Sequence, residues 1–198
     1  MLTVQVLRRL HLSVSFNLNE GECVALQGPS GAGKSLLLRA IADLDPNEGT
    51  VKLDGILREA MPAPRWRSQV TYVAAEPGWW ADTVREHFSL WDQAMPLVER
   101  LGLPPDCGTW NIPRLSTGEK QRLGLVRALM LHSRVLLLDE PTSALDATST
   151  ATVEALVAER VAAGTGVLWS THDGAQARRV ASRLFLMESG GRIEEHPL

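Results

Sequence analysis

The segment GPSGAGKS at 28–35 constrains the fold more than any other part of the chain. The apolar residues 23–26 before it predict a buried strand, and the apolar spacing of 36–44 after it predicts a helix. Its glycines allow successive backbone N–H groups to turn inward, and the dipole of the helix adds to the positive potential there. The sequence therefore predicts a phosphate-binding loop between a strand and a helix.

The side chains of this loop indicate which phosphates it holds. Lys34 is expected to reach the β- and γ-phosphates of a nucleotide and to act in catalysis, and the Ser35 hydroxyl is expected to bind Mg²⁺. A chance glycine-rich loop is the alternative, and the flanking strand and helix argue against it. The predicted nucleotide-binding residues here are Gly28, Pro29, Ser30, Gly31, Ala32, Gly33, Lys34 and Ser35.

An acidic pair follows the apolar run VLLLDE at 135–140. A buried strand that ends at Asp139 delivers a carboxylate to the carboxyl edge of the sheet, where ligands bind in open α/β folds. We expect Asp139 to hold Mg²⁺ through water, and Glu140 to accept a proton from the attacking water. On their own, two acidic residues after a strand would be a solvated strand end.

The segment RLSTGEKQR at 114–122 opens a helix. Ser116 is a suitable N-cap, and Glu119 three residues later completes a capping box. A well-capped helix is one interpretation. The other is a second phosphate-binding surface, because a serine, a glycine and a helix N-terminus lie together. One chain needs one such surface for its γ-phosphate, so a second would serve the nucleotide of another subunit.

Strands alternate with helices along most of the chain, which predicts an α/β fold with a largely parallel sheet. Residues 77–122 interrupt the alternation with helical spacing only, in which Pro96, Pro104 and Pro105 mark breaks. The chain is therefore expected to be one domain, 1–198, whose core comprises 1–76 and 123–198 and whose helical subdomain is about 77–122. The predicted strands are 12–18, 23–26, 50–53, 70–73, 135–138, 167–169 and 184–187, and the other predicted helices are 115–131 and a helix through 153–161.

These motifs and their order resemble those of ATP-binding cassette (ABC) ATPases over nearly the whole chain. The resemblance implies a P-loop NTPase of ABC type, with an N-terminal antiparallel β region and the inserted helical subdomain. It identifies 28–35 as Walker A, Asp139 and Glu140 as the end of Walker B, and His172 as the switch histidine that acts in catalysis. It also assigns the signature motif to Leu115, Ser116, Thr117, Gly118 and Glu119, and the D-loop to Ser143, Ala144, Leu145 and Asp146.

The same resemblance implies ATP and Mg²⁺ as cofactors and a head-to-tail homodimer that closes around two ATP molecules. A separate integral membrane permease subunit is implied as partner, with the chain cytoplasmic and peripheral on the cytoplasmic face of the membrane. Short cassettes of this kind are similar to the ATPase of a bacterial iron exporter, and haem-export cassettes are similar in size. The alternatives are a soluble ABC-type ATPase of DNA repair or translation and a cassette that signals through a membrane partner without transport.

The chain departs from the family pattern at three places. In the signature motif, Thr117 and Glu119 replace the commoner Gly and Gln, while Ser116 and Gly118 are kept. Ala75 stands where the family has the Q-loop glutamine, and the neighbouring Glu76 is the candidate to contact the metal instead. The usual adenine-stacking aromatic has no counterpart before the phosphate loop, which leaves Arg8, Arg9 or His11.

Trp79 and Trp80 follow this altered Q-loop, next to the groove that receives the membrane subunit in the family. Aromatic anchors are typical of interface centres, so the pair is expected to contact the membrane partner. Packing of one or both inside the helical subdomain is the alternative.

Composition argues against other classes of function. The formal net charge is −3 and the basic residues are scattered, so no nucleic-acid partner is expected. The two cysteines, Cys23 and Cys107, lack metal-ligand spacing and are expected to be reduced thiols. The longest apolar runs, such as 135–138, are too short to span a bilayer, so a membrane role would be peripheral.

Overall fold

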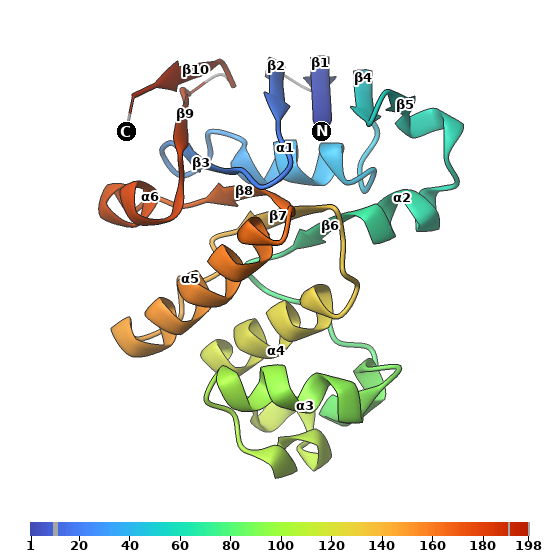
Figure 1. Cartoon of the computed structure of the whole chain (residues 1–198), viewed down its shortest axis with the longest axis vertical. Coiled ribbons are helices and arrows are strands. Elements are labelled where there is room, and N and C mark those ends of the chain that lie inside the picture. The colour runs from blue at the N-terminus through green and yellow to red at the C-terminus, as the bar shows by residue number, and fades with distance from the viewer. Residues whose placement is uncertain (10–11, 190, 198) are drawn as a thin grey trace.

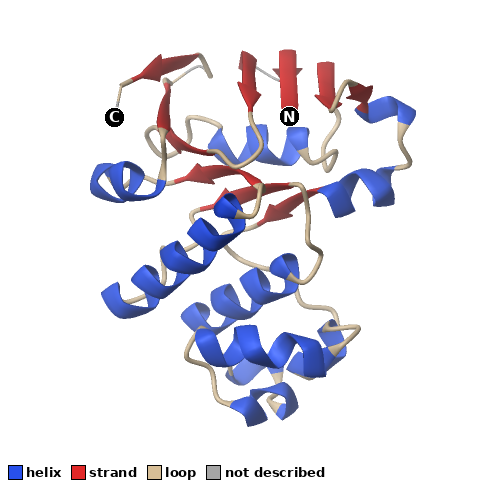
Figure 2. Ribbon diagram, in the orientation of Figure 1, coloured by secondary structure: helices blue, strands red, loops and turns tan. Residues whose placement is uncertain are grey.

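The computed structural model describes residues 1–9, 12–189 and 191–197. These residues form two sheets and six α-helices (Figure 1, Figure 2). The strands are β1 (Leu2–Arg9), β2 (Leu12–Leu18), β3 (Cys23–Gln27), β4 (Glu48–Leu53), β5 (Ile56–Leu57), β6 (Val70–Val73), β7 (Val135–Asp139), β8 (Gly166–Ser170), β9 (Arg183–Met187) and β10 (Ile193–His196). The α-helices are α1 (Lys34–Ile41), α2 (Ala63–Gln69), α3 (Trp91–Arg100), α4 (Thr117–Leu129), α5 (Ala147–Ala162) and α6 (Gly174–Val180).

The larger sheet has the order β10-β9-β3-β8-β7-β6. All neighbouring strands in this sheet are parallel except β9 and β10, which pair antiparallel. Every residue of β7 and of β8 is buried, as expected of central strands covered on both faces. This confirms the predicted α/β fold, and it brings the carboxyl ends of β3, β7 and β8 to one edge of the sheet.

The smaller sheet, β2-β1-β4-β5, is antiparallel throughout. It lies across α1 from the larger sheet, toward the upper end of the molecule in Figure 1. Leu2, Val4, Val14 and Val51 from this sheet join α1 and β3 in the first hydrophobic cluster. The antiparallel β region that the family resemblance implies is therefore present.

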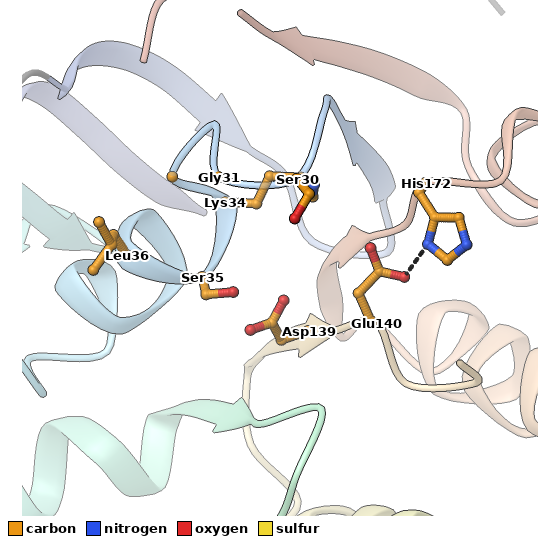
Figure 3. A pocket seen from close by; sticks show the side chains of 9 residues that line it. Ser30, Gly31, Lys34, Ser35, Leu36, Asp139, Glu140 and His172 are labelled. Atoms are coloured by element: carbon orange, nitrogen blue, oxygen red, sulfur yellow. Dashed lines mark hydrogen bonds and ion pairs between the residues drawn. The ribbon is translucent and has the colours of Figure 1, made fainter. Parts of the chain in front are cut away.

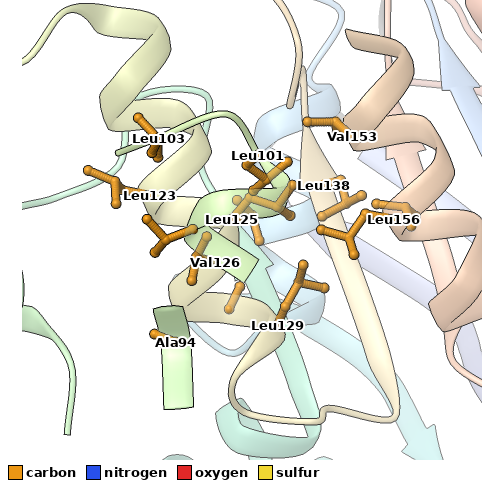
Figure 4. Close-up of a cluster of buried hydrophobic side chains, with 14 of the residues drawn as sticks. Ala94, Leu101, Leu103, Leu123, Leu125, Val126, Leu129, Leu138, Val153 and Leu156 are labelled. Atoms are coloured by element: carbon orange, nitrogen blue, oxygen red, sulfur yellow. The ribbon is translucent and has the colours of Figure 1, made fainter. Parts of the chain in front are cut away.

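The helical segment lies at the opposite end of the molecule, where α3 and α4 pack together (Figure 1). Its buried side chains, such as Leu101 and Leu103, belong to the same hydrophobic cluster as Leu138 of β7 and Leu156 of α5 (Figure 4). The helix α4 runs across the predicted boundary at residue 122. The division into two subdomains stays a prediction, and the helical segment shares its core with one face of the sheet.

Several elements differ from the sequence prediction. Pro96 lies inside α3 and does not break it, because the buried residues Ala94 and Val98 hold that helix against its neighbours despite the missing N–H of the proline. The prediction missed β1, β5, α2 and α6, whereas the strand, turn and strand expected from residue 185 onward correspond to β9 and β10. It also placed the start of α1 two residues late, since the helix begins at Lys34 inside the phosphate loop.

Candidate nucleotide-binding site

The phosphate loop connects β3 to α1 in the conformation that its glycines permit. Gly31 and Gly33 have φ angles of 79° and 105°, which other residues adopt only with strain. A Cβ on Gly28 would lie 2.3 Å from the carbonyl oxygen of Met187, so only glycine fits against β9. Lys34 Nζ donates to the carbonyl oxygens of Gly28 at 2.8 Å and Pro29 at 3.2 Å, which holds the ammonium inside the loop.

A cavity of about 400 Å³ opens beside this loop (Figure 3). The loop and the first turn of α1 form one wall, and the other consists of the last residue of β7, Glu140 after it, and His172 after β8. Asp139, Glu140 and His172 therefore face the phosphate loop, as the sequence motifs predict. The lining residues are Ser30, Gly31, Gly33, Lys34, Ser35, Leu36, Asp139, Glu140 and His172.

The carboxylate of Asp139 is 4% exposed and is held by two hydroxyl groups. Ser170 Oγ donates to Oδ1 at 2.8 Å, and Tyr72 Oη donates to Oδ2 at 2.8 Å. Burial, and then the nearby Asp139 carboxylate, raise the pKa of Tyr72 well above its ordinary value, so this phenol remains a donor. Tyr72, the only tyrosine of the chain, thus contacts the candidate site, and sequence reasoning gave it no role there.

Glu140 and His172 form the second pair in the cavity. His172 Nδ1 lies 2.7 Å from Glu140 Oε2, as the dashed line in Figure 3 marks. Glu140 has a φ of 48°, a region that costs energy for a residue with a side chain and that is concentrated at functional sites. The backbone N–H of Glu140 donates to Ser170 Oγ, with 3.1 Å between the nitrogen and the oxygen. The carboxylate is thus fixed at the edge of the cavity, where it can accept a proton.

The donor set fits Mg²⁺ held together with a nucleotide. Among the described residues, no group of three or more His, Cys, Asp or Glu side chains could enclose a metal ion. Ser35 and Asp139 supply one hydroxyl and one carboxylate to the cavity, and Mg²⁺ in such sites takes its remaining ligands from phosphates and water. When bound, the ion neutralises charge on the phosphates. Glu76 is exposed and does not line the cavity, and its contact with the ion stays a prediction.

The signature residues do not line this cavity. Ser116 caps α4, where its Oγ accepts from Glu119 N at 3.2 Å and its N–H donates to Glu119 Oε2 at 2.7 Å, so the predicted capping box is present. Leu115 is buried, whereas Ser116 and Thr117 are exposed and free to contact another molecule. A Cβ on Gly118 would lie 2.8 Å from the carbonyl oxygen of Ala144, so this glycine is needed where the D-loop passes.

The D-loop connects Glu140 to α5. Asp146 caps α5 by accepting from Ser149 N at 2.7 Å, and this hydrogen bond lowers the pKa of its carboxyl group. Ser143 and Ala144 are exposed and bond to Gln121, a buried residue of α4 that sequence reasoning quoted within its motif but gave no role. The expectation for Arg8, Arg9 and His11 concerns side chains outside the described residues.

The tryptophan pair divides into a packed residue and an exposed one. Trp79 is partly buried against the second hydrophobic cluster, and its Nε1 finds no hydrogen-bond partner among the described residues. Trp80 is 69% exposed. The guanidinium of Arg127 lies over both rings, 5.1 Å and 4.7 Å from their centroids, and His87 Nε2 accepts from the Trp80 N–H at 2.9 Å. The pair is thus held in place with one ring facing outward.

Comparison with known proteins identifies the family of the chain. The family model described as "ABC transporter" matches residues 12–143. The "Probable iron export ATP-binding protein FetA" of Escherichia coli K12 is 36% identical over 195 residues, which cover 92% of this chain and 87% of the relative. "Phosphate import ATP-binding protein PstB 2" of Natronomonas pharaonis is 34% identical over 209 residues, which cover 93% and 74%.

Solved structures give the same result. The structure of an ATP-binding subunit of an ABC transporter superposes with a TM-score of 0.88 at 27% identity, and covers 100% of this chain and 90% of that one. A dimeric, post-hydrolysis ATP-binding cassette bound to ADP and Pi has a TM-score of 0.87 at 24% identity, covering 100% and 99%, and supports the fold. The chain therefore belongs to the ABC transporter family, as one of its ATP-binding cassette ATPases that use ATP and Mg²⁺.

Proposed function

We propose that this chain is the ATP-hydrolysing subunit of an ABC transporter, and that it works as a head-to-tail dimer around two ATP molecules. One observation carries the dimer. The cavity collects the phosphate loop, Asp139, Glu140 and His172, but none of the signature residues 115–119. The exposed Ser116 at the start of α4 therefore faces a ligand held by a second copy. That arrangement places a helix N-terminus against the γ-phosphate from across the interface.

The residues of one chain supply the remaining roles. Lys34 and the backbone N–H groups of the loop bind the phosphates, and Ser35 and Asp139 hold the ion. Glu140 accepts the proton of the attacking water, and His172, within 2.7 Å of that carboxylate, holds the water and the γ-phosphate in line. Hydrolysis then breaks the bond between the β- and γ-phosphates, so the γ-phosphate no longer links the two copies, and the dimer opens.

A separate transmembrane subunit is the proposed partner of this cycle. None of the described helices has both the length and the apolar character needed to cross a membrane. A groove of about 290 Å³ beside the tryptophans includes Pro77, Arg127 and the exposed Leu131 in its lining. Trp80 and this groove form a surface with an aromatic anchor and an apolar floor, which suits a short helix of the partner on the cytoplasmic face of the membrane.

We propose a metal ion as the cargo of that partner, and export as its direction. The similarity to FetA supports this choice, because FetA is named for iron export. The import proteins among the relatives, such as PstB 2, are named for other cargo and define the second candidate. The cargo does not reach the cassette, so this part of the proposal depends on the partner.

Capture of the partner tests the proposal. Glu140→Gln is expected to bind ATP, to lose hydrolysis and to accumulate as a dimer, which gives a stable bait for detergent-solubilised membranes. Lys34→Ala is the control, because it removes ATP binding and therefore the closed dimer. A single polytopic protein that co-purifies with Glu140→Gln and ATP supports a transporter or a signalling partner, and iron efflux from vesicles that contain both proteins separates these. Recovery of soluble partners or ribosomes alone contradicts transport.

A further inference from the structure

Gln121 is a polar side chain buried among the loops of the candidate site. It lies on α4, is 2% exposed, and uses its whole carboxamide. Its Nε2 donates to the carbonyl oxygen of Glu140 at 2.9 Å and to Ser143 Oγ at 3.2 Å, and lies 3.4 Å from the carbonyl oxygen of Ala75. Its Oε1 accepts from Ala144 N at 3.2 Å. One side chain thus joins the candidate base, the D-loop and the altered Q-loop.

The contacts of Gln121 belong to one face of α4. Gly118, one turn earlier, packs against the carbonyl oxygen of Ala144, where a Cβ would lie 2.8 Å away. Gly124, one turn later, packs against Pro77, where a Cβ would lie 2.4 Å from Cγ. Residues three apart lie on the same side of a helix, so the two glycines bring the helix close enough for Gln121 to reach the loops.

We propose that Gln121 is a positioning residue that ties the signature helix of each chain to that chain's own Glu140. This inference rests on the proposed head-to-tail dimer. There, the start of α4 contacts the nucleotide of the second copy, whereas Glu140 faces the nucleotide of its own chain. Gln121 is the direct connection between these two contacts, so occupancy of one ATP site sets the position of the base in the other.

The backbone of Glu140 explains why such a support is needed. Its φ of 48° is unfavourable for a residue with a side chain, and it persists only where the surroundings hold it. Ser170 holds the N–H of this residue and Gln121 holds its carbonyl oxygen. The carbonyl oxygen of Glu140 also accepts from Ser143 N at 3.2 Å. Without the Gln121 donor, this half-buried carbonyl keeps only that one partner, and the direction of the carboxylate is less fixed.

The test compares two buried glutamines. Gln121→Met keeps the length of the side chain and removes its hydrogen bonds, and Gln121→Asn keeps the amide but is too short to reach. Gln176→Met is the matched control, because Gln176 is 4% exposed on α6 and bonds to Thr142, Glu154 and Thr171 without touching Glu140 or α4. Each variant is measured for Tm, for the affinity of the isolated chain for a fluorescent ATP analogue, and for kcat.

We expect Gln121→Met and Gln121→Asn to lower kcat at least 10-fold, while the affinity of the isolated chain for the analogue changes less than 2-fold. Gln176→Met is expected to keep kcat within 2-fold at a comparable loss of Tm. In the Glu140→Gln background, Gln121→Met should raise the ATP concentration at half-dimerisation at least 5-fold, measured by size-exclusion chromatography. A kcat of the Gln121 variants near the parent value overturns the proposal. So does a fall in kcat that follows the fall in Tm equally in Gln121→Met and in Gln176→Met.

The same measurements separate this inference from the proposed function. If Glu140→Gln itself does not dimerise with ATP, the head-to-tail dimer is wrong, and the link between two sites fails with it. If Glu140→Gln dimerises and the Gln121 variants behave as the parent, only the role of Gln121 is wrong. If Glu140→Gln dimerises with ATP, and kcat falls in the Gln121 variants but not in Gln176→Met, both the dimer and the role of Gln121 are supported.

Discussion

The Tyr72 hydroxyl donates to Asp139 Oδ2 at 2.8 Å, from the neighbouring strand of the sheet. Ser170 donates to the other oxygen of this carboxylate, so each oxygen of Asp139 already accepts a hydrogen bond that fixes its direction. Such outer partners fix the direction of a metal-binding carboxylate and tune its affinity. Where Asp139 holds the ion as proposed, the tyrosine therefore supplies a polar contact that orients the proposed ligand.

Tyr72→Phe removes only this hydroxyl. We expect the variant to need about 10-fold more Mg²⁺ for half-maximal ATP hydrolysis. Its affinity for ATP in the presence of a chelator should be unchanged, since the phosphate loop is intact. Titration with Mn²⁺ and ATP, followed by electron paramagnetic resonance, gives the metal affinity directly. Ser133→Ala is the control, because it removes a buried hydroxyl that bonds to Thr71 rather than to Asp139. Equal metal dependence of Tyr72→Phe and the parent would show that the contact has no role toward the ion.

His172→Ala tests the pair beside the cavity. The imidazole contacts Glu140 at 2.7 Å and is 73% exposed, so its loss should leave the fold intact. We expect kcat to fall about 100-fold or more, a typical effect of losing a group that orients proton transfer, with ATP affinity retained. His196→Ala, on β10 at the far edge of the sheet, should keep full turnover. Loss of ATP binding in His172→Ala would instead assign the histidine to nucleotide affinity.

Replacement of each tryptophan separates packing from partner binding. Trp79→Ala removes a ring that packs on the second hydrophobic cluster and should lower the free energy of unfolding by about 2–3 kcal/mol. Trp80→Ala removes an exposed ring that contacts Arg127 and should lower it by only about 0.5–1 kcal/mol. Chemical denaturation measures both values. Trp80→Ala should nevertheless reduce recovery on the membrane partner, and unchanged recovery would leave the exposed ring without a role in docking.

The ordered motifs of the sequence predict the fold class and most of the site. A phosphate loop needs a strand before it and a helix after it, and an acidic pair after a buried strand must lie at the carboxyl edge of a parallel sheet. These local rules correctly brought Lys34, Asp139 and Glu140 to one cavity, and the order of the motifs added His172.

The contacts made at a distance were not predictable in the same way. Tyr72 fits the apolar pattern of a strand, and only the alignment of β6 beside β7 reveals that its hydroxyl reaches Asp139. Gln121 has the polarity of an exposed helix position, yet it is buried because Gly118 and Gly124 allow the loops to approach. Tyr72 and Asp139 are 67 residues apart in the sequence, so their contact leaves no periodic pattern there. The same holds for the approach of the loops to the two glycines of α4.

Gly124→Ala tests the close approach of α4 to the segment after β6. The added Cβ would lie 2.4 Å from Pro77 Cγ and 2.8 Å from its Cβ, so the segment or the helix must shift. Because alanine favours a helix by about 1 kcal/mol over glycine, any net loss of Tm reports the steric conflict. Gly78→Ala is the matched control, since nothing lies within 4 Å of its added Cβ. A higher Tm for Gly124→Ala than for the parent would mean that α4 and Pro77 separate freely.

The two cysteines predict how stability changes at alkaline pH. Both are buried, and burial raises the pKa of Cys23 to about 12 and that of Cys107 to about 11, from 9.0. Above pH 9 the unfolded chain releases these protons while the folded chain keeps them, so the free energy of unfolding falls as pH rises from 9 toward 11. The double variant Cys23→Ala/Cys107→Ala lacks this effect. The difference between its free energy of unfolding and that of the parent, measured in urea, should therefore become smaller over that pH range. Neither thiol should react with iodoacetamide in the folded protein at pH 8, because the thiolate is the reactive form. A constant deficit, together with rapid labelling, would place the thiols in contact with solvent.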